Sequence, residues 1–166
     1  MKYFIFFAGM VLLSSVTVSA QHNDLTKEID EQVWKPFIRY FNSDDREGFK
    51  SVHSKEVTRV IQDGKDIFGY EQYFKPLPDS LKNQKTEWIK NIELRFVQRI
   101  AKNDRAFEVG YYKTTYTNNK TGEKTSNIGK FHVLIRRENG VWKIWMDADT
   151  SEGATEDAFN KAEVIQ

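Results

Sequence analysis

Two side chains that could do acid–base chemistry, His132 and Asp147, are predicted to lie opposite each other on neighbouring strands. The turn Asn139-Gly140 favours a two-residue type I′ hairpin, which pairs Glu138 with Val141. Counting back from that pair places His132 opposite Asp147, with about 4.5–5.5 Å between their Cβ atoms. At that distance the carboxylate would raise the histidine pKa and favour one tautomer. The pair is expected to act as a general base if it faces a pocket, and as a structural ion pair if it faces solvent or a dimer interface.

The same register predicts the rest of this hairpin. One face becomes wholly apolar, because Ile135 faces Ile144, Val133 faces Met146 and Phe131 faces Ala148. On the other face Leu134 is expected opposite Trp145.

Two further polar side chains each allow two interpretations. Arg59 stands in an apolar strand, where it could bind an acidic ligand head or pair with a nearby carboxylate. His53 follows a short predicted helix and is expected to bond a carbonyl at the helix end rather than a metal. The three histidines form neither a His-x-His nor a His-x3-His pattern, so no metal site is predicted. The chain has no Gly-x-Gly-x-x-Gly or P-loop motif, and no cofactor is predicted.

The elements that must hold these residues change from helices to strands along the chain. Apolar residues recur at helical spacing from Leu25 to Phe41, and Pro36 predicts a kink or a break near residues 33–35. A short helix over 45–52 and a hairpin with strands at 57–62 and 65–68 follow. From Trp88 onward the period is two, which predicts four long antiparallel strands. The order indicates an α+β fold with the helices on one face of the sheet.

Glycines inside the long strands indicate that this sheet is curved. Gly110 and Gly129 interrupt two strands, and a glycine there often marks a bulge or a bend. A curved sheet covered by helices leaves a cavity on its concave side, which is a natural small-molecule site. The residues expected to line it are Trp34, Phe37, Arg59, Tyr112 and Trp145.

The first twenty residues predict an export signal. Lys2 precedes an uncharged stretch that ends in the small residues Val18-Ser19-Ala20. We therefore expect a signal peptide over 1–20, a single domain over 21–166, and a periplasmic or secreted protein with no stable membrane insertion after cleavage. Removing Lys2 from the 25 basic residues leaves 24, against 24 acidic ones. A neutral body argues against nucleic-acid binding, and the absence of cysteine fits a bacterial envelope protein.

Five short motifs, spread over residues 25–150, resemble the NTF2-like superfamily and within it the SnoaL-like and DUF4440-type bacterial domains. They are Val33-Trp34-x-x-Phe37-Ile38, Asn42-Ser43-Asp44-Asp45 with Phe49, Val57-x-Arg59-Val60-Ile61, Gly69-Tyr70-Glu71-x-Tyr73-Phe74 and Asn139-Gly140-Val141-Trp142-Lys143-Ile144. The resemblance implies a cone-shaped, cystatin-like fold, in which a curved, mostly antiparallel sheet carries the N-terminal helices on its concave face. It also implies a pocket for a small molecule and frequent homodimers.

The resemblance implies different site residues for different members. Ketosteroid isomerases have a carboxylate base where this chain has Arg59, which cannot be a base at neutral pH. SnoaL-like cyclases use an aspartate near the positions of Asp147 and Asp149. A dehydratase arrangement would need His132 and Asp147 together with tyrosines such as Tyr112 and Tyr116.

Three functions follow from the sequence. The first is an exported module that binds a small apolar or aromatic ligand as a homodimer. The second is a cyclase, dehydratase or isomerase with His132 and Asp147 as its acid–base pair. The third is a structural or dimerisation domain without a ligand, in which Trp145 and Leu134 lie at the partner surface.

Overall fold

The computed structural model describes residues 24–76, 78 and 87–165, and the predicted signal peptide lies outside them. Residues 24–29 are α-helical and continue into η1 (Asp30–Trp34) and α2 (Lys35–Asn42), which are followed by α3 (Arg46–Ser51), α4 (Tyr70–Tyr73) and α6 (Glu156–Lys161). The strands are β1 (His53–Ile61), β2 (Asp66–Phe68), β3 (Trp88–Lys102), β4 (Arg105–Asn118), β5 (Lys124–Glu138), β6 (Val141–Thr150) and β7 (Glu163–Val164). None of the helices within these ranges is both long enough and apolar enough to cross a bilayer.

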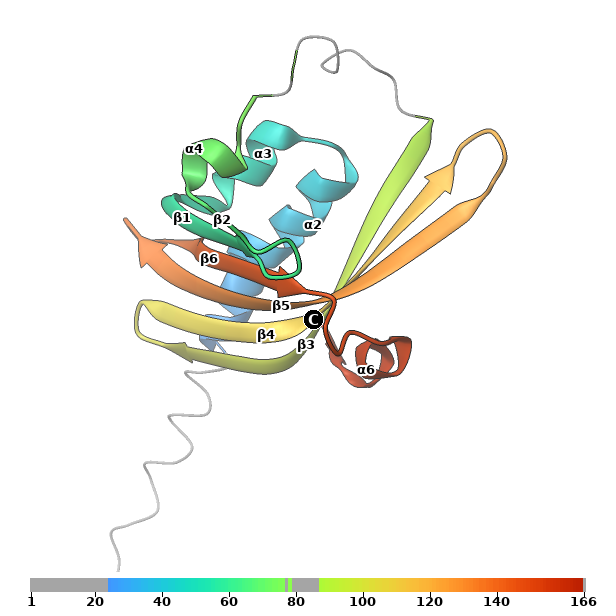
Figure 1. The fold of residues 1–166 in the computed structure, drawn as a ribbon. Coiled ribbons are helices and arrows are strands. Elements are labelled where there is room, and N and C mark those ends of the chain that lie inside the picture. Colours follow the sequence, from blue (N-terminus) through green and yellow to red (C-terminus); the bar gives the residue numbers. More distant parts are fainter. Residues whose placement is uncertain (1–23, 77, 79–86, 166) are drawn as a thin grey trace, which may run out of the picture.

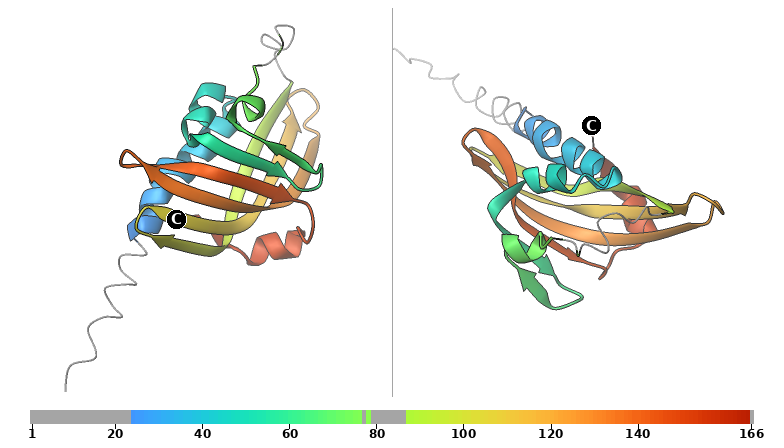
Figure 2. Two further views of the ribbon diagram at one scale, coloured as in Figure 1. Left: turned by 60° about the vertical axis from the view of Figure 1, so that its left-hand side comes forward. Right: turned by 90° about the horizontal axis from the view of Figure 1, so that it is seen from above.

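The strands form one seven-stranded sheet in the order β2-β1-β6-β5-β4-β3-β7. Neighbouring strands in the sheet run antiparallel, except for β1 and β6, which run parallel to each other. The N-terminal helix and α3 lie over the concave face, while α6 lies on the other side of the sheet (Figures 1 and 2). The predicted α+β cone with helices on the concave face is confirmed.

Pro36 is accommodated without breaking the helix. A proline has no N–H to donate to the carbonyl four residues earlier. The preceding turn, η1, is π-helical, and the Lys35 N–H donates to the Asp30 carbonyl five residues back. A single π-helical turn of this kind absorbs the irregularity. Residues 24–42 therefore stay helical throughout. Of the two expectations, a kink or a break near 33–35, the break is wrong.

The long strands bend sharply near their middles, and Figure 1 shows their two halves pointing in different directions. A bulge at Val97 interrupts the pairing of β3 with β4 beside Gly110. A Cβ on Gly110 would lie 2.1 Å from the Arg95 carbonyl oxygen, and one on Gly129 would lie 2.3 Å from the Tyr112 ring. Both positions thus need glycine because other chain atoms approach closely at the bend.

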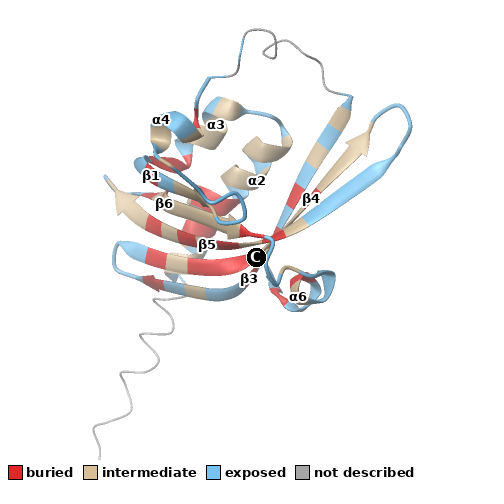
Figure 3. Ribbon diagram, in the orientation of Figure 1, coloured by how far each residue is buried: buried red, intermediate tan, exposed pale blue. Residues whose placement is uncertain are grey.

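Helix and sheet share one core, and an ion network runs through it. Val33 and Trp34 are fully or almost fully buried against strands β3 to β6. Figure 3 shows buried residues along the middle strands of the sheet. Glu108, at 0% exposure, accepts from the Arg99 Nε at 2.8 Å and from the Trp34 indole N–H. Arg99 also binds Asp30 on the helix. Burial raises the pKa of Glu108, although Arg99 opposes this. The network fastens η1 to the sheet.

The register between β5 and β6 differs from the predicted one beyond the first few pairs. Glu138 pairs with Val141 and Ile135 with Ile144, as expected. A bulge then makes Leu134 pair with Met146 instead of Trp145. From there every pair is shifted by one, so that Asp147 pairs with Val133 and His132 pairs with Ala148. The predicted pairing of His132 with Asp147 is wrong, because one extra residue in β6 moves Asp147 to the opposite face.

Candidate functional site

The concave side of the sheet contains a cavity of about 280 Å³ beneath α2, α3 and α4. Half of its sixteen lining residues are aromatic, so rings form a large part of its walls. Its lining consists of Trp34, Phe37, Phe41, Phe49, Arg59, Tyr73, Ile92, Leu94, Tyr112, Thr114, Tyr116, Phe131, Val133, Ile144, Asp147 and Asp149. The volume lies just below the usual range for small-molecule sites, about 300–1,000 Å³.

Arg59 organises the polar end of this cavity. Its Nη2 lies 2.6 Å from Asp149 Oδ2, and its Nη1 lies 3.5 Å from Asp147 Oδ1. The same Nη1 donates to the carbonyls of Val60 and Asp147, both at 3.1 Å. Parallel pairing of β1 with β6 creates this contact, since Arg59 and Asp147 are register partners. Burial alone would lower the pKa of Arg59, but the two aspartates raise it above its ordinary value, so the guanidinium stays charged.

Two tyrosines complete the polar end. The Tyr73 hydroxyl donates to Asp147 Oδ2 at 3.1 Å, and the Tyr112 hydroxyl donates to Asp149 Oδ2 at 3.3 Å. Burial, reinforced by Asp147, raises the pKa of Tyr73 well above its ordinary value. Burial and Asp149 raise the pKa of Tyr112 to about 12. Both phenols therefore remain protonated donors at neutral pH.

His53 lies behind this cavity wall, among rings that line it. Its Nδ1 bonds the Phe49 carbonyl at 2.8 Å, which is the predicted contact with a helix-end carbonyl. Its Nε2 has no partner in the part of the chain described. Burial lowers the pKa of His53 to about 4, although Asp147 opposes this shift. The ring is thus neutral at pH 7, with Nδ1 donating and the Nε2 lone pair free.

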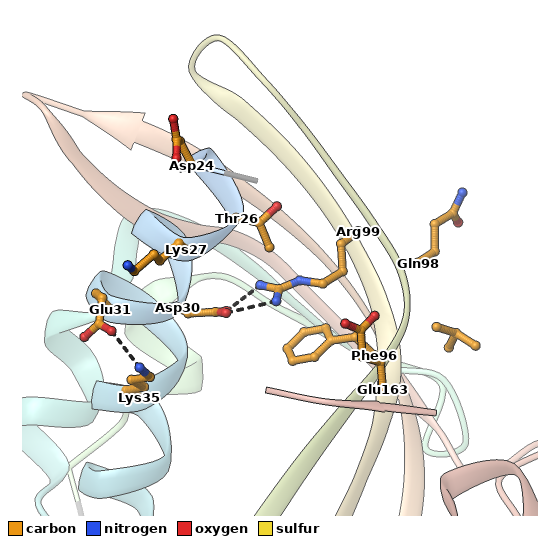
Figure 4. A pocket seen from close by; sticks show the side chains of 11 residues that line it. Asp24, Thr26, Lys27, Asp30, Glu31, Lys35, Phe96, Gln98, Arg99 and Glu163 are labelled. Atoms are coloured by element: carbon orange, nitrogen blue, oxygen red, sulfur yellow. Dashed lines mark hydrogen bonds and ion pairs between the residues drawn. The ribbon is translucent and has the colours of Figure 1, made fainter. Parts of the chain in front are cut away.

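A larger hollow of about 650 Å³ lies between the N-terminal helix and β3 (Figure 4). Charged side chains dominate its lining, and they bind one another: Asp30 holds Arg99, and Glu31 holds Lys35 at 2.6 Å. It lacks the aromatic walls of the smaller cavity. We therefore take the smaller cavity as the candidate site. No group of His, Cys, Asp and Glu that could hold a metal ion occurs among the described residues.

Comparison with known proteins gives structural likenesses only. The sequence matches no protein-family model and no curated protein. An NTF2-like protein with a cystatin-like fold from Novosphingobium aromaticivorans is 13% identical over 90% of this chain and 96% of its own, with a TM-score of 0.61. The fold of this chain is NTF2-like. Two other solved structures share this fold. A type 2 hexachlorocyclohexane dehydrochlorinase is 12% identical over 82% of this chain and 91% of its own, with a TM-score of 0.57. The association domain of C. elegans CaMKII is 13% identical over 81% of this chain and 98% of its own, with a TM-score of 0.54. The finer assignment to SnoaL-like or DUF4440-type domains stays a prediction.

The NTF2-like cone gathers most of the predicted pocket residues. Trp34, Phe37, Arg59 and Tyr112 line the cavity. Trp145 does not, because it occupies the bulge and lies on the outer face, 4.8 Å from the Arg136 guanidinium.

His132 is also on the outer face of the NTF2-like sheet. It stacks on Phe107 with 6.5 Å between the ring centroids, and burial lowers its pKa instead of a carboxylate raising it. Asp147 lines the cavity, whereas His132 does not. Tyr73 belongs to one motif of the resemblance and was not predicted as a site residue. It reaches the site from α4, and nothing in its helical spacing distinguishes it from a core tyrosine.

Proposed function

We propose that this chain is an exported small-molecule-binding protein that holds one apolar or aromatic ligand in the 280 Å³ cavity. The observation that carries the proposal is a hollow with aromatic walls and a single polar end. Apolar walls supply affinity for the body of a ligand, and a few convergent polar groups fix its orientation. The cavity size suits one or two fused rings.

Binding of 2-naphthylmethanol, measured by calorimetry, tests this proposal. Thr114 and Thr115 are neighbours in β4 on opposite faces: Thr114 lines the cavity, while Thr115 bonds Ser126 at 2.9 Å on the other side. Thr114→Phe should fill the hollow and weaken binding about tenfold or more, whereas Thr115→Phe should leave it unchanged. Circular dichroism confirms that both variants fold. Absence of binding to the native chain, or equal binding to both variants, would refute the proposal.

The acid–base alternative is not proposed. It required His132 and Asp147 in one cavity, and the two residues lie on opposite faces of the sheet.

We also propose that two copies associate through the outer sheet face, as the sequence predicted. Phe107, Leu134 and Met146 form a half-buried apolar row across three strands, and Trp145 lies beside them. Half-exposed aromatic residues of this kind are common at the centre of interfaces. Light scattering should give twice the mass of the chain, and Trp145→Glu should give a monomer. A native monomer at high concentration would contradict this.

Export is the remaining part of the proposal. Its basis is the sequence of residues 1–20 alone. Mass spectrometry of the protein from a bacterial periplasm or culture medium should find a chain beginning at Gln21. An intact Met1 on mature protein in the cytoplasm would overturn it.

A further inference from the structure

We propose that the cavity selects ligands whose apolar ring system carries a protonated amine, and that it rejects carboxylates. This inference rests on the proposed ligand-binding function and adds the chemical class of the ligand. Its basis is the way in which the charges at the polar end are already paired.

Arg59 is the only cation among the described residues that line the cavity, and both of its Nη nitrogens are engaged. Nη2 is held by Asp149 at 2.6 Å, and Nη1 is shared among Asp147 and two backbone carbonyls. To bind both Nη nitrogens in a bidentate contact, an acidic ligand would have to displace one of these carboxylates. The displaced aspartate would then be left half-buried without its partner, which is costly. The interpretation of Arg59 as a receptor for an acidic head is therefore the less favourable of the two.

The charge of the cavity wall is negative. Among the lining residues that the structure describes, only Arg59, Asp147 and Asp149 are charged, so one positive charge faces two negative ones and the formal sum is −1. His53 behind the wall is neutral at pH 7 because burial lowers its pKa to about 4. A cation of charge +1 would bring the polar end to neutrality, whereas an anion would double its negative charge.

The two carboxylates retain acceptor capacity for such a cation. A carboxylate offers about four lone-pair sites. Asp149 accepts from Arg59 and Tyr112 through the same oxygen, Oδ2. The side chains of Asp147 and Asp149 are 14% and 20% exposed, so they can be reached. An ammonium has three donors and no acceptor, which matches the remaining lone pairs of the two carboxylates.

The aromatic walls favour the same ligand. Tyr73 and Tyr112 lie beside the two carboxylates, and their ring faces attract a cation. Charge-assisted hydrogen bonds with additional ring contacts compensate an ammonium for the water that it loses on entry. An alcohol of the same shape would gain the apolar contacts but lose the ionic ones.

Three ligands with one ring system and different charges test the inference on the native chain. We would measure 2-naphthylmethylamine, 2-naphthylmethanol and 2-naphthoate by calorimetry at pH 7 and low salt. The amine should bind about tenfold or more tighter than the alcohol, in line with the strength of a charge-assisted hydrogen bond. The carboxylate should bind more weakly than either. Asp149→Asn should abolish the preference for the amine while retaining the alcohol. Glu156→Gln, an exposed acid on α6, should leave the order unchanged.

The outcomes separate this inference from the function on which it rests. Equal binding of amine and alcohol, or tightest binding of the carboxylate, would overturn the inference and leave the ligand-binding function intact. An amine preference that survives Asp149→Asn would also overturn it, because the preference would then come from elsewhere. Failure of all three ligands to bind would refute both. The native series remains decisive even if Asp149→Asn does not fold.

Discussion

Acidification should destabilise this protein in part through one buried side chain, His53. Burial lowers the pKa of His53 in the native state from 6.5 to about 4, with smaller contributions from Arg59 and Lys143. In the unfolded chain the ring is solvated and titrates near its ordinary value, about 6.5. Well above pH 6.5 neither state binds the proton, so His53 contributes no pH dependence there. Between pH 6.5 and 4 the unfolded chain binds it and the native state does not.

The magnitude follows from that gap. Over about 2.5 pH units the free energy of unfolding should fall by about 1.4 kcal/mol per unit, or about 3 kcal/mol in total at pH 4. Below pH 4 both states are protonated and the loss stops growing. Domains are typically stable by about 5–15 kcal/mol, so this single group could remove a large part of the total.

Urea unfolding at half-unit steps from pH 8 to 4 measures this dependence. His53→Asn keeps a side-chain donor for the Phe49 carbonyl but loses the ring contacts of the histidine, so the variant should be less stable than the native chain at pH 8. Because asparagine does not titrate, the stability of the variant should fall less steeply below pH 6.5. His132→Asn is the control, since that ring lies at the outer face and should contribute far less. If the native chain and His53→Asn lose stability in parallel, the reasoning fails. A native-state NMR titration of His53 near pH 6.5 would refute it independently.

Two other substitutions test the bend and the buried ion network. Gly110→Ala should destabilise by about 1–3 kcal/mol or more, because its Cβ would lie 2.1 Å from the Arg95 carbonyl oxygen; Gly69→Ala, with no atom within 4 Å, should change the melting temperature little. Glu108→Ala should lower the free energy of unfolding by about 1–3 kcal/mol or more, because the buried Trp34 indole N–H and the Arg99 Nε lose their acceptor, although Arg99 keeps Asp30. Glu156→Ala breaks an exposed ion pair and should change that free energy by less than about 1 kcal/mol in urea unfolding. Equal effects of either substitution and its control would contradict the corresponding argument.

Much of the architecture could be predicted from sequence because local patterns determine it. The alternation that begins at Trp88, the Asn139-Gly140 turn and the two strand glycines each depend on a few adjacent residues, and the fold agrees with them. Pro36 shows the limit of such local rules. The sequence shows that Pro36 lacks a backbone N–H to donate. Whether the helix then breaks or adopts a π-helical turn depends on its packing against the sheet, where Val33 and Trp34 are buried.

The site could be predicted only in part, because it depends on a register that no local pattern reports. Trp34 and Phe37 follow from helical spacing, and Arg59 from being a charge in an apolar strand. The bulge in β6 has no marker in its sequence, since Trp145 and Met146 are ordinary strand residues. Errors of this kind are severe because a shift of one residue moves each later side chain to the other face.

That single extra residue also determines the chemistry of the cavity. With a regular hairpin, Asp147 would share the outer face with His132, and Arg59 would lack its register partner on the concave face. The bulge instead turns Asp147 inward, where the parallel pairing of β1 with β6 aligns it with Arg59. Asp147 thereby loses a partner that could exchange a proton near neutral pH and gains one that cannot. The polar end is consequently suited to holding a charge in place rather than to moving a proton, which favours binding over acid–base catalysis in this cavity.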